Sequence, residues 1–383
     1  MNIGWLIQGH ERYGVRTATL GMAAVAERVG VEPVFLSLSR GVFEEELESA
    51  GRPVVRVMSE ASPNFSGGWR GRLLGAYRSW HYARSLGVEL SRTVERYQLS
   101  AVHLVWPNLV WVAGPSLSRL GVPGLWEMPN VVGSAAGAWA YRTACRNWGI
   151  HPLPNSDFTR QTLLRGRQSS LPATVMHPPV DVQHWDASCV EAVERDRLGV
   201  PAEAPLLVLA ARITGSKGQH LAIEALAEME GEPHLMLLGN ADDPLYNNEL
   251  RTLASRLNVS EQVHWIGRVN DVERYVAAAD VLLNTRVDPE PYGLTVVEAM
   301  SMARPVVAHS LGGPAETVVD EETGWLYGEP TVAALSAALA RAMRDRPRWH
   351  EMGNAGRRRT EERYSFEAAA KRYRKVLEYL KLT

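Results

Sequence analysis

The stretch that decides the fold is EPYGLTVVEAM at residues 290–300, followed by PVVA at 305–308 and GGPAE at 312–316. The apolar run at 281–284 comes just before it and predicts a buried parallel strand, and residues 294–302 predict the helix that follows. In an open α/β sheet, ligands bind at the carboxyl ends of the strands, where such strand-to-helix loops lie. The segment therefore predicts a binding loop of an α/β protein.

Two glutamates stand out in this segment. Glu290 falls on the predicted loop, and Glu298 falls just over one turn inside the predicted helix. The helix N-terminus near Gly293 offers free N–H groups and a partial positive charge to an anionic ligand. The residues around Glu298 make that helix apolar nearly all round, so a buried carboxylate there needs hydrogen-bond donors. Two adjacent ribose hydroxyls would supply them.

Two glutamates with seven residues between them, followed by Gly-Gly-x-x-Glu, resemble the signature of a large family of retaining glycosyltransferases, glycosyltransferase family 4 or glycosyl transferases group 1. The resemblance extends over most of residues 205–330 and, more faintly, over the whole chain. It implies the GT-B fold, in which two Rossmann-like, doubly wound α/β domains face a central cleft. It also implies transfer of a sugar from a nucleoside-diphosphate sugar to a hydroxyl acceptor, with retention of the anomeric configuration. We expect a UDP- or GDP-sugar, and a role in glycan, glycolipid or natural-product biosynthesis.

Length and composition agree with a two-domain globular enzyme. The 383 residues suffice for two cores. A net charge of −2 leaves no global basic field that would attract nucleic acid. Cys145 and Cys189 lack metal-ligand spacing and indicate free thiols in a reducing compartment. Because no signal peptide is visible and no run approaches about 18 apolar residues, we expect a cytoplasmic protein.

Strands and helices alternate in each half of the chain, which implies parallel sheets with crossover helices. The predicted strands of the first half are 3–7, 33–36, 54–57, 102–105, 124–127, 150–154 and 175–177. Those of the second half are 206–211, 234–238, 263–266, 281–284, 306–308 and 325–327. We place an acceptor-binding domain at 1–180 and a donor-binding domain at 181–362. The helix predicted at 363–383 packs back on the first domain, as the family implies, or on its own domain.

Basic residues after the first strand of the second half provide a candidate diphosphate site. Arg212 and Lys217 flank four residues of a glycine-bearing loop, and Lys217 is the only lysine before Lys371. In the family, an Arg and a Lys with this spacing hold the donor diphosphate. Arg can fork two phosphate oxygens, whereas Lys acts as a point charge. Because negative charge grows on the diphosphate as the glycosidic bond breaks, fixed cations there favour the transition state. We assign Arg212, Lys217 and Glu290 as catalytic.

The resemblance implies further donor contacts. Glu290 is expected beside the transferred sugar and Glu298 at the ribose, while a nucleophile role for Glu290 is disfavoured. Retaining members are described by a same-face displacement, in which a donor phosphate oxygen takes the acceptor proton. Residues 267–269 are expected at the nucleobase edge, and the backbone at 292–294 at the sugar and phosphate. The other implied donor-binding residues are Gly14, Gly267, Arg268, Val269, Tyr292, Gly293, Leu294 and Thr295.

A metal is not expected at this site. The sequence contains no Asp-x-Asp triplet, the usual metal-dependent diphosphate site of the other glycosyltransferase fold. Asp288-Pro-Glu290 has related spacing, but Glu290 already belongs to the two-glutamate motif. Arg212, Lys217 and the helix N-terminus can offset the charge of the diphosphate. We therefore expect neither a metal nor any other cofactor.

The first half departs from the family, and we place the acceptor there. Members often have a Gly-Gly pair after the first strand, whereas this chain has QGHERYGV at 8–15. Members also place a His-Asp where this chain has Glu127, so the role of that His cannot be carried over. Trp106 and Trp126 either stack on a sugar or belong to the core, and His10 is either an acceptor contact or ordinary loop polarity. The candidate acceptor residues are His10, Arg12, Trp106, Asn108, Glu127 and Asn130.

Two questions stay open at the level of the sequence. Residues 69–97 interleave arginines with Trp and Tyr, and they form either a solvated crossover helix or a weak peripheral contact with anionic lipid. The acceptor is accordingly a small molecule, a glycan or a lipid-linked glycan. The activity has two rivals, a sugar-nucleotide 2-epimerase of the same fold and a catalytically silent subunit that binds a nucleotide-sugar. The intact set of Arg212, Lys217, Glu290 and Glu298 argues against the silent subunit.

Overall fold

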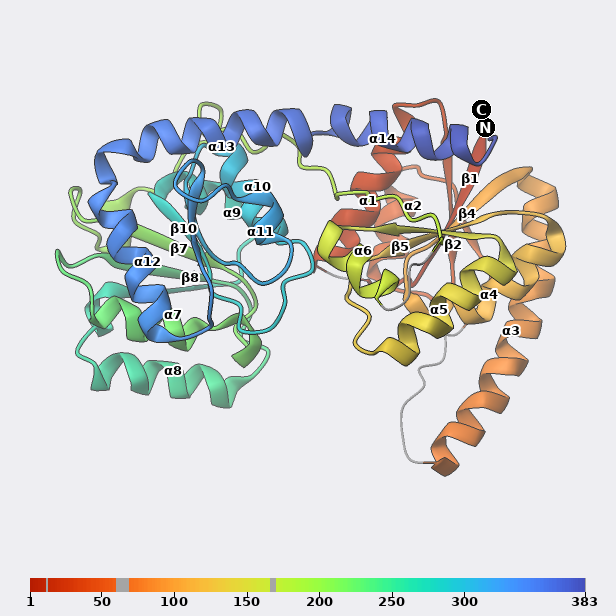
Figure 1. Ribbon diagram of the computed structural model, residues 1–383, viewed down its shortest axis with the longest axis horizontal. Coiled ribbons are helices and arrows are strands. Elements are labelled where there is room, and N and C mark those ends of the chain that lie inside the picture. The colour runs from red at the N-terminus through yellow and green to blue at the C-terminus, as the bar shows by residue number, and fades with distance from the viewer. Residues whose placement is uncertain (12, 60–68, 166–169, 383) are drawn as a thin grey trace. The chain divides into compact units, whose positions relative to one another are not determined.

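The computed structural model describes the whole chain except residues 12, 60–68, 166–169 and 383 (Figure 1). The chain divides into two compact units, each with its own sheet. Unit 1 comprises Met1–Pro179 and Phe366–Thr383, and unit 2 comprises Val180–Ser365. The chain thus leaves unit 1 next to the boundary placed at residue 180 and returns to it for its last helix.

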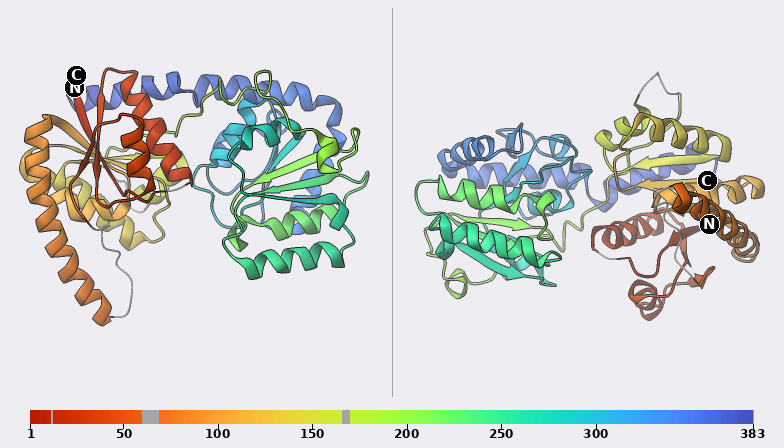
Figure 2. Two further views of the ribbon diagram at one scale, coloured as in Figure 1. Left: turned by 180° about the vertical axis from the view of Figure 1, so that it is seen from behind. Right: turned by 90° about the horizontal axis from the view of Figure 1, so that it is seen from below.

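Unit 1 contains a six-stranded parallel sheet in the order β3-β2-β1-β4-β5-β6. Its strands are β1 (Asn2–Ile7), β2 (Glu32–Ser37), β3 (Val54–Arg56), β4 (Leu99–Leu104), β5 (Gly124–Met128) and β6 (Ile150–Pro154). Its helices are α1 (Tyr13–Glu27), α2 (Val42–Ser49), α3 (Trp69–Tyr97), α4 (Pro107–Leu120), α5 (Ala135–Trp148), α6 (Asp157–Leu164) and α14 (Phe366–Tyr379). Successive side chains of β1 point to opposite faces, so Trp5 packs with α1, α2 and α14 while Leu6 packs with α3–α6. Helices therefore cover both faces of the sheet (Figure 2).

Unit 2 contains a second six-stranded parallel sheet, in the order β12-β11-β10-β7-β8-β9. Its strands are β7 (Leu206–Ala210), β8 (His234–Leu238), β9 (Val263–Gly267), β10 (Val281–Asn284), β11 (Val306–His309) and β12 (Gly324–Tyr327). Its α-helices are α7 (Gln219–Ala227), α8 (Pro244–Arg256), α9 (Val272–Ala278), α10 (Leu294–Ser301), α11 (Pro314–Thr317), α12 (Val332–Arg344) and α13 (Trp349–Arg363). Short 3-10 helices are η1 (Arg195–Leu198), η2 (Gly215–Lys217), η3 (Ser260–Gln262) and η4 (Arg346–Arg348). One core lies under α7, α8, α12 and α13, and the other lies under α9 and α10.

The two sheets share one topology, and this topology indicates where a ligand binds. The first and fourth strands of each unit lie side by side at the centre, β1 with β4 and β7 with β10. From each pair the chain winds outward in opposite directions, so the loops after these two strands lead away from each other. Ligands of open α/β sheets bind at such switch points, at the carboxyl ends of the strands. In unit 2 the two loops start at Ala211 and Thr285, and in unit 1 they start at Gln8 and Val105.

One predicted strand, at residues 175–177, is wrong, because this segment forms no strand in the structure. The N–H groups of Thr174 and Met176 donate to the carbonyls of Pro152 and Pro154 on β6, at 3.1 and 2.8 Å. A parallel ladder also needs N–H groups on the other strand that donate back, and proline has none. The prolines of β6 therefore end the sheet, although the segment itself is apolar enough for a strand.

The C-terminal helix α14 packs on unit 1, which answers the question that its amphipathic pattern left open. It contacts α1. Tyr373, Val376 and Leu377 are buried in the same core as Trp5. The two cysteines are free, one buried and one exposed. Among the described residues, no helix combines the length and the apolar character needed to cross a lipid bilayer.

Candidate functional site

The loop between β7 and α7 carries the first two predicted cations. Arg212 follows β7, and Lys217 is the last residue of η2. The next residue must be glycine, because Gly218 has a φ of 70° and a Cβ there would lie 2.0 Å from the Thr285 carbonyl oxygen. The Thr285 hydroxyl donates to the Lys217 carbonyl at 2.9 Å. The loops after β7 and β10 are thereby held together at the switch point of the unit 2 sheet.

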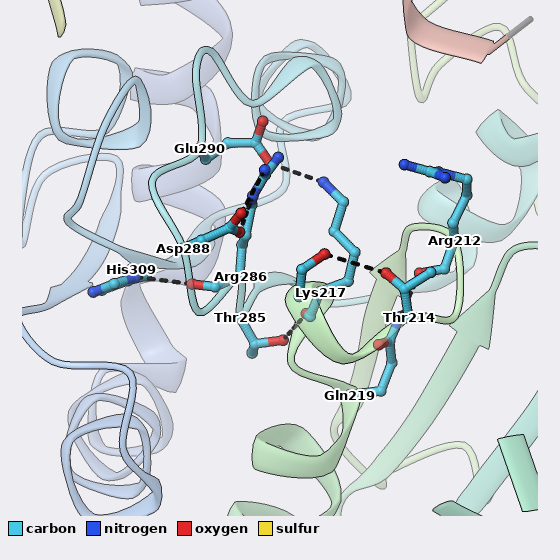
Figure 3. A network of polar contacts seen from close by, with 10 residues as sticks. Arg212, Thr214, Lys217, Gln219, Thr285, Arg286, Asp288, Glu290 and His309 are labelled. Atoms are coloured by element: carbon cyan, nitrogen blue, oxygen red, sulfur yellow. Dashed lines mark hydrogen bonds and ion pairs between the residues drawn. The ribbon is translucent and has the colours of Figure 1, made fainter. Parts of the chain in front are cut away.

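Lys217 and Glu290, which come from these two loops, form an ion pair (Figure 3). The distance from Lys217 Nζ to Glu290 Oε2 is 2.9 Å, and the side chains are 21% and 13% exposed. The structure thus brings together two residues that the sequence predicted as catalytic and that lie 73 positions apart. Their low exposure strengthens the attraction relative to a surface pair.

Arg286 is a third cation of the site, and the sequence analysis missed it. Its NH1 donates to Glu290 Oε2 at 3.2 Å. Its Nε and NH2 fork the Asp288 carboxylate at 2.5 and 3.0 Å. Burial lowers the pKa of Arg286, but the bonds to Asp288 and Glu290 outweigh burial and raise it overall. The hydrogen bonds from Arg286 also lower the pKa of Asp288, so both groups stay charged at neutral pH.

Arg212 is held more loosely than Lys217. Its side chain is 50% exposed, and its NH1 lies 3.5 Å from Asp242 Oδ2. Figure 3 shows the guanidinium group apart from the Lys217–Glu290 pair. Its backbone is fixed instead, because the buried Gln219 donates from Nε2 to the Arg212 carbonyl at 2.9 Å. The backbone of Arg212 is therefore anchored separately from its half-exposed head.

The Gly-Gly pair after β11 shapes the loop that carries Glu290. Gly312 has a φ of 111°, and a Cβ there would lie 2.1 Å from the Glu290 carbonyl oxygen. A Cβ at Gly313 would lie 2.4 Å from the Tyr292 carbonyl oxygen. Without a side chain at either position, the Gly313 N–H donates to the Glu290 carbonyl at 2.8 Å. The Gly-Gly-x-x-Glu motif thus has a structural reason, the close approach of two backbones.

Helix α10 places Glu298 just over one turn from its start at Gly293, which has a φ of 86°. Within the described part of the chain, no hydrogen bond or ion pair to the Glu298 carboxylate is found. Burial, with a smaller effect of the Glu273 carboxylate, raises the pKa of Glu298 to about 8. Glu298 therefore has unused hydrogen-bonding capacity at the switch point.

The other predicted donor contacts lie on loops of unit 2. Tyr292 is 4% exposed and packs with Val297 and Tyr364, so only its backbone is available to a ligand. Leu294 and Thr295 form the first turn of α10. Gly267 ends β9, and Arg268, which is exposed, and Val269 follow it. Their contact with a nucleobase stays a prediction.

Four of the predicted acceptor residues of unit 1, His10, Trp106, Asn108 and Asn130, lie in the loops after β1, β4 and β5 or in the first turn of α4. His10 is exposed, and its Nδ1 lies 3.3 Å from Ser39 Oγ. Trp106 and Asn108 are half-buried after β4, and Asn130 is exposed after β5. All of these positions stay predicted acceptor contacts.

Two further residues of the loop after β1 were named by the sequence. Arg12 lies outside the described residues. Gly14 lies in the first turn of α1, and a Cβ there would meet no atom within 4 Å. A structural need for glycine exists instead at Gly9, where a Cβ would lie 1.9 Å from the Ser39 carbonyl oxygen. Contact of Gly14 with the donor stays a prediction.

Trp126 is part of the core and does not wall a binding site. It is 1% exposed and stacks on Tyr141 with ring centroids 4.8 Å apart. The alternative that it stacks on a sugar is therefore wrong. Trp126 points away from the face of β5 that carries Glu127, because neighbouring residues of a strand alternate.

Glu127 is bound from inside unit 1 through a chain of hydrogen bonds. Its Oε1 accepts from Trp5 Nε1 at 3.1 Å and lies 2.7 Å from His103 Nδ1. The other ring nitrogen of His103 lies 2.8 Å from the hydroxyl of Tyr373 on α14. Glu127 is 13% exposed, so its position is set by the core and by the C-terminal helix.

Glu11 is a second residue that the sequence analysis missed. Its Oε1 accepts from the Gln8 N–H at 2.9 Å and from Trp106 Nε1 at 2.8 Å. Burial outweighs these two bonds and raises the pKa of Glu11 to about 7, with a small further rise from Glu127. The side chain is 5% exposed, and in the described structure its Oε2 has no hydrogen-bond partner. Because most residues of the loop around it are polar or glycine, nothing in the sequence indicates that this carboxyl is buried.

The second half of the chain is similar in sequence to known glycosyltransferases. Residues 190–359 match the model of the family described as glycosyl transferases group 1. The lipopolysaccharide core biosynthesis glycosyltransferase LpsE of Rhizobium meliloti is 29% identical over 188 residues, which cover 49% of this chain and 54% of that protein. A GDP-mannose-dependent monoacylated alpha-(1-6)-phosphatidylinositol monomannoside mannosyltransferase of Corynebacterium glutamicum is 30% identical over 220 residues, 54% of this chain and 56% of that protein. The chain thus spans just over half the length of these two relatives.

A solved structure is similar over nearly the whole chain. HepE of Anabaena, crystallised in complex with UDP, superposes with a TM-score of 0.82 over 99% of this chain and 100% of that chain, at 19% identity. At this identity the likeness shows the fold alone. The predicted GT-B fold, with a Rossmann-like sheet in each half of the chain, is confirmed.

Proposed function

Because residues 190–359 match the model of glycosyl transferases group 1, we propose that this protein transfers a sugar from a nucleoside-diphosphate sugar to a hydroxyl acceptor. The observation that carries the proposal is the cluster of Arg212, Lys217 and Arg286 at the switch point of unit 2. Two or more cations on well-supported loops suit a leaving group that gains negative charge in the transition state. UDP- and GDP-sugars are the proposed donors, since the Corynebacterium relative is named for GDP-mannose and HepE was crystallised with UDP.

We assign a part of the donor to each of these groups of unit 2. Lys217 and Arg212 bind the diphosphate, and the first turn of α10 adds its N–H groups. Glu298 binds the ribose, whose hydroxyls fill its unused hydrogen-bonding capacity. Glu290 lies beside the diphosphate site and contacts the transferred sugar.

The proposed stereochemistry is retention by same-face displacement. The bond from the anomeric carbon to the diphosphate breaks, the acceptor oxygen bonds to that carbon on the same face, and the acceptor proton passes to a donor phosphate oxygen. Glu290 suits a supporting role, because the ion pair with Arg286 occupies its carboxylate and weakens it as a nucleophile. It can instead stabilise positive charge at the anomeric carbon and accept hydrogen bonds from the sugar.

We propose that the reaction needs no metal. The support is the charge already present, Arg212, Lys217 and Arg286 together with the N-terminus of α10. Activity should therefore persist in excess EDTA, and a moderate stimulation by Mg²⁺ would reflect product release. Complete loss on chelation, restored by Mg²⁺ or Mn²⁺, would contradict this part of the proposal.

We propose a glycan or lipid-linked acceptor that binds to unit 1. The relatives compared above are named for lipopolysaccharide core and phosphatidylinositol mannoside synthesis. Helix α3 supports contact with anionic lipid, because Trp80 is 59% exposed and Val88 is 49% exposed beside Arg84 and Arg92. The protein should sediment with phosphatidylglycerol vesicles but not with phosphatidylcholine vesicles. Trp80→Ala should reduce the fraction of protein that sediments with phosphatidylglycerol vesicles. The cytoplasmic location inferred from the sequence remains part of the proposal.

A donor screen tests the proposed function. Thermal shifts with UDP-, GDP-, ADP- and dTDP-sugars should identify a donor, because a ligand that binds only the folded state stabilises by mass action. NMR of the products formed from that donor then separates the rivals. Glycosyl transfer or slow donor hydrolysis supports the proposal, formation of a C2-epimer without acceptor supports an epimerase, and binding without turnover supports a silent subunit. The relatives compared above are named as transferases, which favours the first outcome.

A further inference from the structure

We propose that Arg286 is a positioning residue that holds the Glu290 carboxylate in place when Lys217 leaves it to bind the diphosphate of the donor. The inference rests on the proposed function, because an anionic ligand is what draws Lys217 away. It deepens that function by describing how a site whose cations are paired with carboxylates can open to a substrate.

Two cations meet one oxygen in this site. Glu290 Oε2 lies 2.9 Å from Lys217 Nζ and 3.2 Å from Arg286 NH1. The two cations repel each other, and the shared carboxylate offsets that repulsion. Either cation can be released at a smaller cost than if it were the sole partner, because the other one still compensates the carboxylate. A carboxylate that is only 13% exposed would otherwise be left unpaired.

The two cations differ in how firmly they are anchored. Arg286 also forks Asp288 through Nε and NH2, at 2.5 and 3.0 Å, so its planar head is fixed on both sides. Its carbonyl accepts a bond from the buried His309 ring at 2.8 Å, which ties its backbone to β11. Lys217 has a flexible stem, and the contact that its ammonium makes with Glu290 is a point contact. Lys217 is therefore the partner that can move, and Arg286 the one that stays.

A different assignment is that Arg286 itself contacts the diphosphate. The two assignments differ in what happens when Glu290 is neutralised. If Arg286 acts through Glu290, Arg286→Gln strengthens the ion pair between Glu290 and Lys217. This effect disappears in a Glu290→Gln background. If Arg286 binds phosphate directly, Arg286→Gln weakens ligand binding by the same factor in both backgrounds.

A ligand-free measurement tests the first step. Lys217 is the only lysine of unit 2, and the exposed Lys371, Lys375 and Lys381 serve as internal references. In limiting acetic anhydride, followed by peptide mass spectrometry, Arg286→Gln should lower the labelling rate of Lys217 by about threefold or more, the size expected for coupled neighbours. Arg286→Lys, which keeps a charge but cannot fork Asp288, should give a smaller shift in the same direction. In the Glu290→Gln background, Arg286→Gln should have no effect.

Arg341→Gln is the matched control, because Arg341 also contacts acidic side chains, Asp320 and Glu321, in unit 2. It should leave Lys217 labelling unchanged. Equal labelling of Lys217 in wild type, Arg286→Gln and Arg286→Lys would overturn the inference, whatever the protein does with nucleotides.

Calorimetry with UDP and GDP tests the second step by the same double-mutant cycle. Arg286→Gln should weaken the binding of the nucleoside diphosphate by about threefold or more in the wild-type background. It should not change that affinity in the Glu290→Gln background. Equal weakening in both backgrounds would show that Arg286 contacts phosphate and would overturn the inference. A wild-type protein that binds no nucleoside diphosphate would instead contradict the proposed function, and the role of Arg286 toward a diphosphate would fall with it.

Discussion

At the scale of residues, Arg212 and Lys217 face the same proposed ligand but are held to different degrees. Lys217 is 21% exposed and paired with Glu290, whereas Arg212 is 50% exposed and 3.5 Å from Asp242. We expect Lys217→Ala and Arg212→Ala each to lower turnover by roughly 10²–10³, the usual effect of removing one transition-state donor. Rates of product formation measure this, and unchanged circular dichroism shows that the fold survives. Wild-type turnover in both variants would contradict the assignment of Arg212 and Lys217 to the donor diphosphate.

The raised pKa of Glu298 predicts that the stability of the protein depends on pH. Burial raises this pKa to about 8 in the folded state from the ordinary value of 4.5, so the folded state binds the proton more tightly between these two values. Stability should therefore fall as the pH rises from about 4.5 to about 8, since the unfolded state ionises first. Glu298→Gln should abolish this loss and show a higher melting temperature than wild type at pH 8 but a similar one at pH 5.

Glu322→Gln serves as the control for that experiment, because Glu322 is an exposed glutamate of the same unit. A melting-temperature difference between Glu298→Gln and wild type that stays constant from pH 5 to pH 8 would contradict the prediction.

The sequence predicted the motif residues of the site but not their partners. Lys217 was predicted because a single lysine in a glycine-bearing loop is conspicuous in this chain. Glu290 was predicted because it belongs to the two-glutamate motif that resembles the family. Arg286 gives no such signal, since nearly all of the 41 basic residues are Arg. Asp242, on the loop after β8, faces Arg212 only because β8 lies beside β7 in the sheet. Which strands are neighbours is a long-range property that local patterns do not contain.

At the scale of elements, local periodicity predicted the strands of both sheets and one strand too many, at 175–177, but not where the last helix packs. The apolar side of α14 would fit either unit, and the choice depends on Tyr373, which completes a core next to Trp5 and His103. Burial raises the pKa of Tyr373 well above its ordinary value, so its hydroxyl stays protonated. We therefore expect different effects of substitution at two tyrosines of this helix, because Tyr373 is buried and Tyr379 is 60% exposed.

Tyr373→Phe should lower the free energy of unfolding by about 1–3 kcal/mol, because it leaves one nitrogen of the buried His103 without a partner. Tyr379→Phe should change it by less than about 0.5 kcal/mol, as expected for a surface position. Urea unfolding monitored by circular dichroism measures both. Similar values for the two variants would show that the bond between His103 and Tyr373 contributes no stability.

At the scale of the whole molecule, the two sheets repeat one strand order but carry different chemistry at their switch points. The switch point of unit 2 carries the Lys217–Glu290 and Arg286–Glu290 pairs. That of unit 1 carries the buried Glu11, bound by Gln8 and Trp106. The cations of the first arrangement suit an anionic ligand, whereas the buried carboxyl of the second does not. We therefore propose that charge at the switch point, which the shared topology leaves free to differ, favours the donor in unit 2 and the acceptor in unit 1.

Hydrogen exchange followed by mass spectrometry tests that separation across the chain. A saturating nucleoside diphosphate should slow exchange most in 212–218 and 286–298, because the ligand pairs with the Lys217 and Arg212 heads and covers the first turn of α10. The matching nucleoside without phosphates should slow exchange near Glu298 in α10. It should leave the exchange rate of 212–218 unchanged, because Arg212 and Lys217 are proposed to bind the charged diphosphate. Protection of 212–218 by the nucleoside equal to that by the diphosphate would mean that this loop closes over the base or ribose. The charge division between the two switch points would then not be what places the donor.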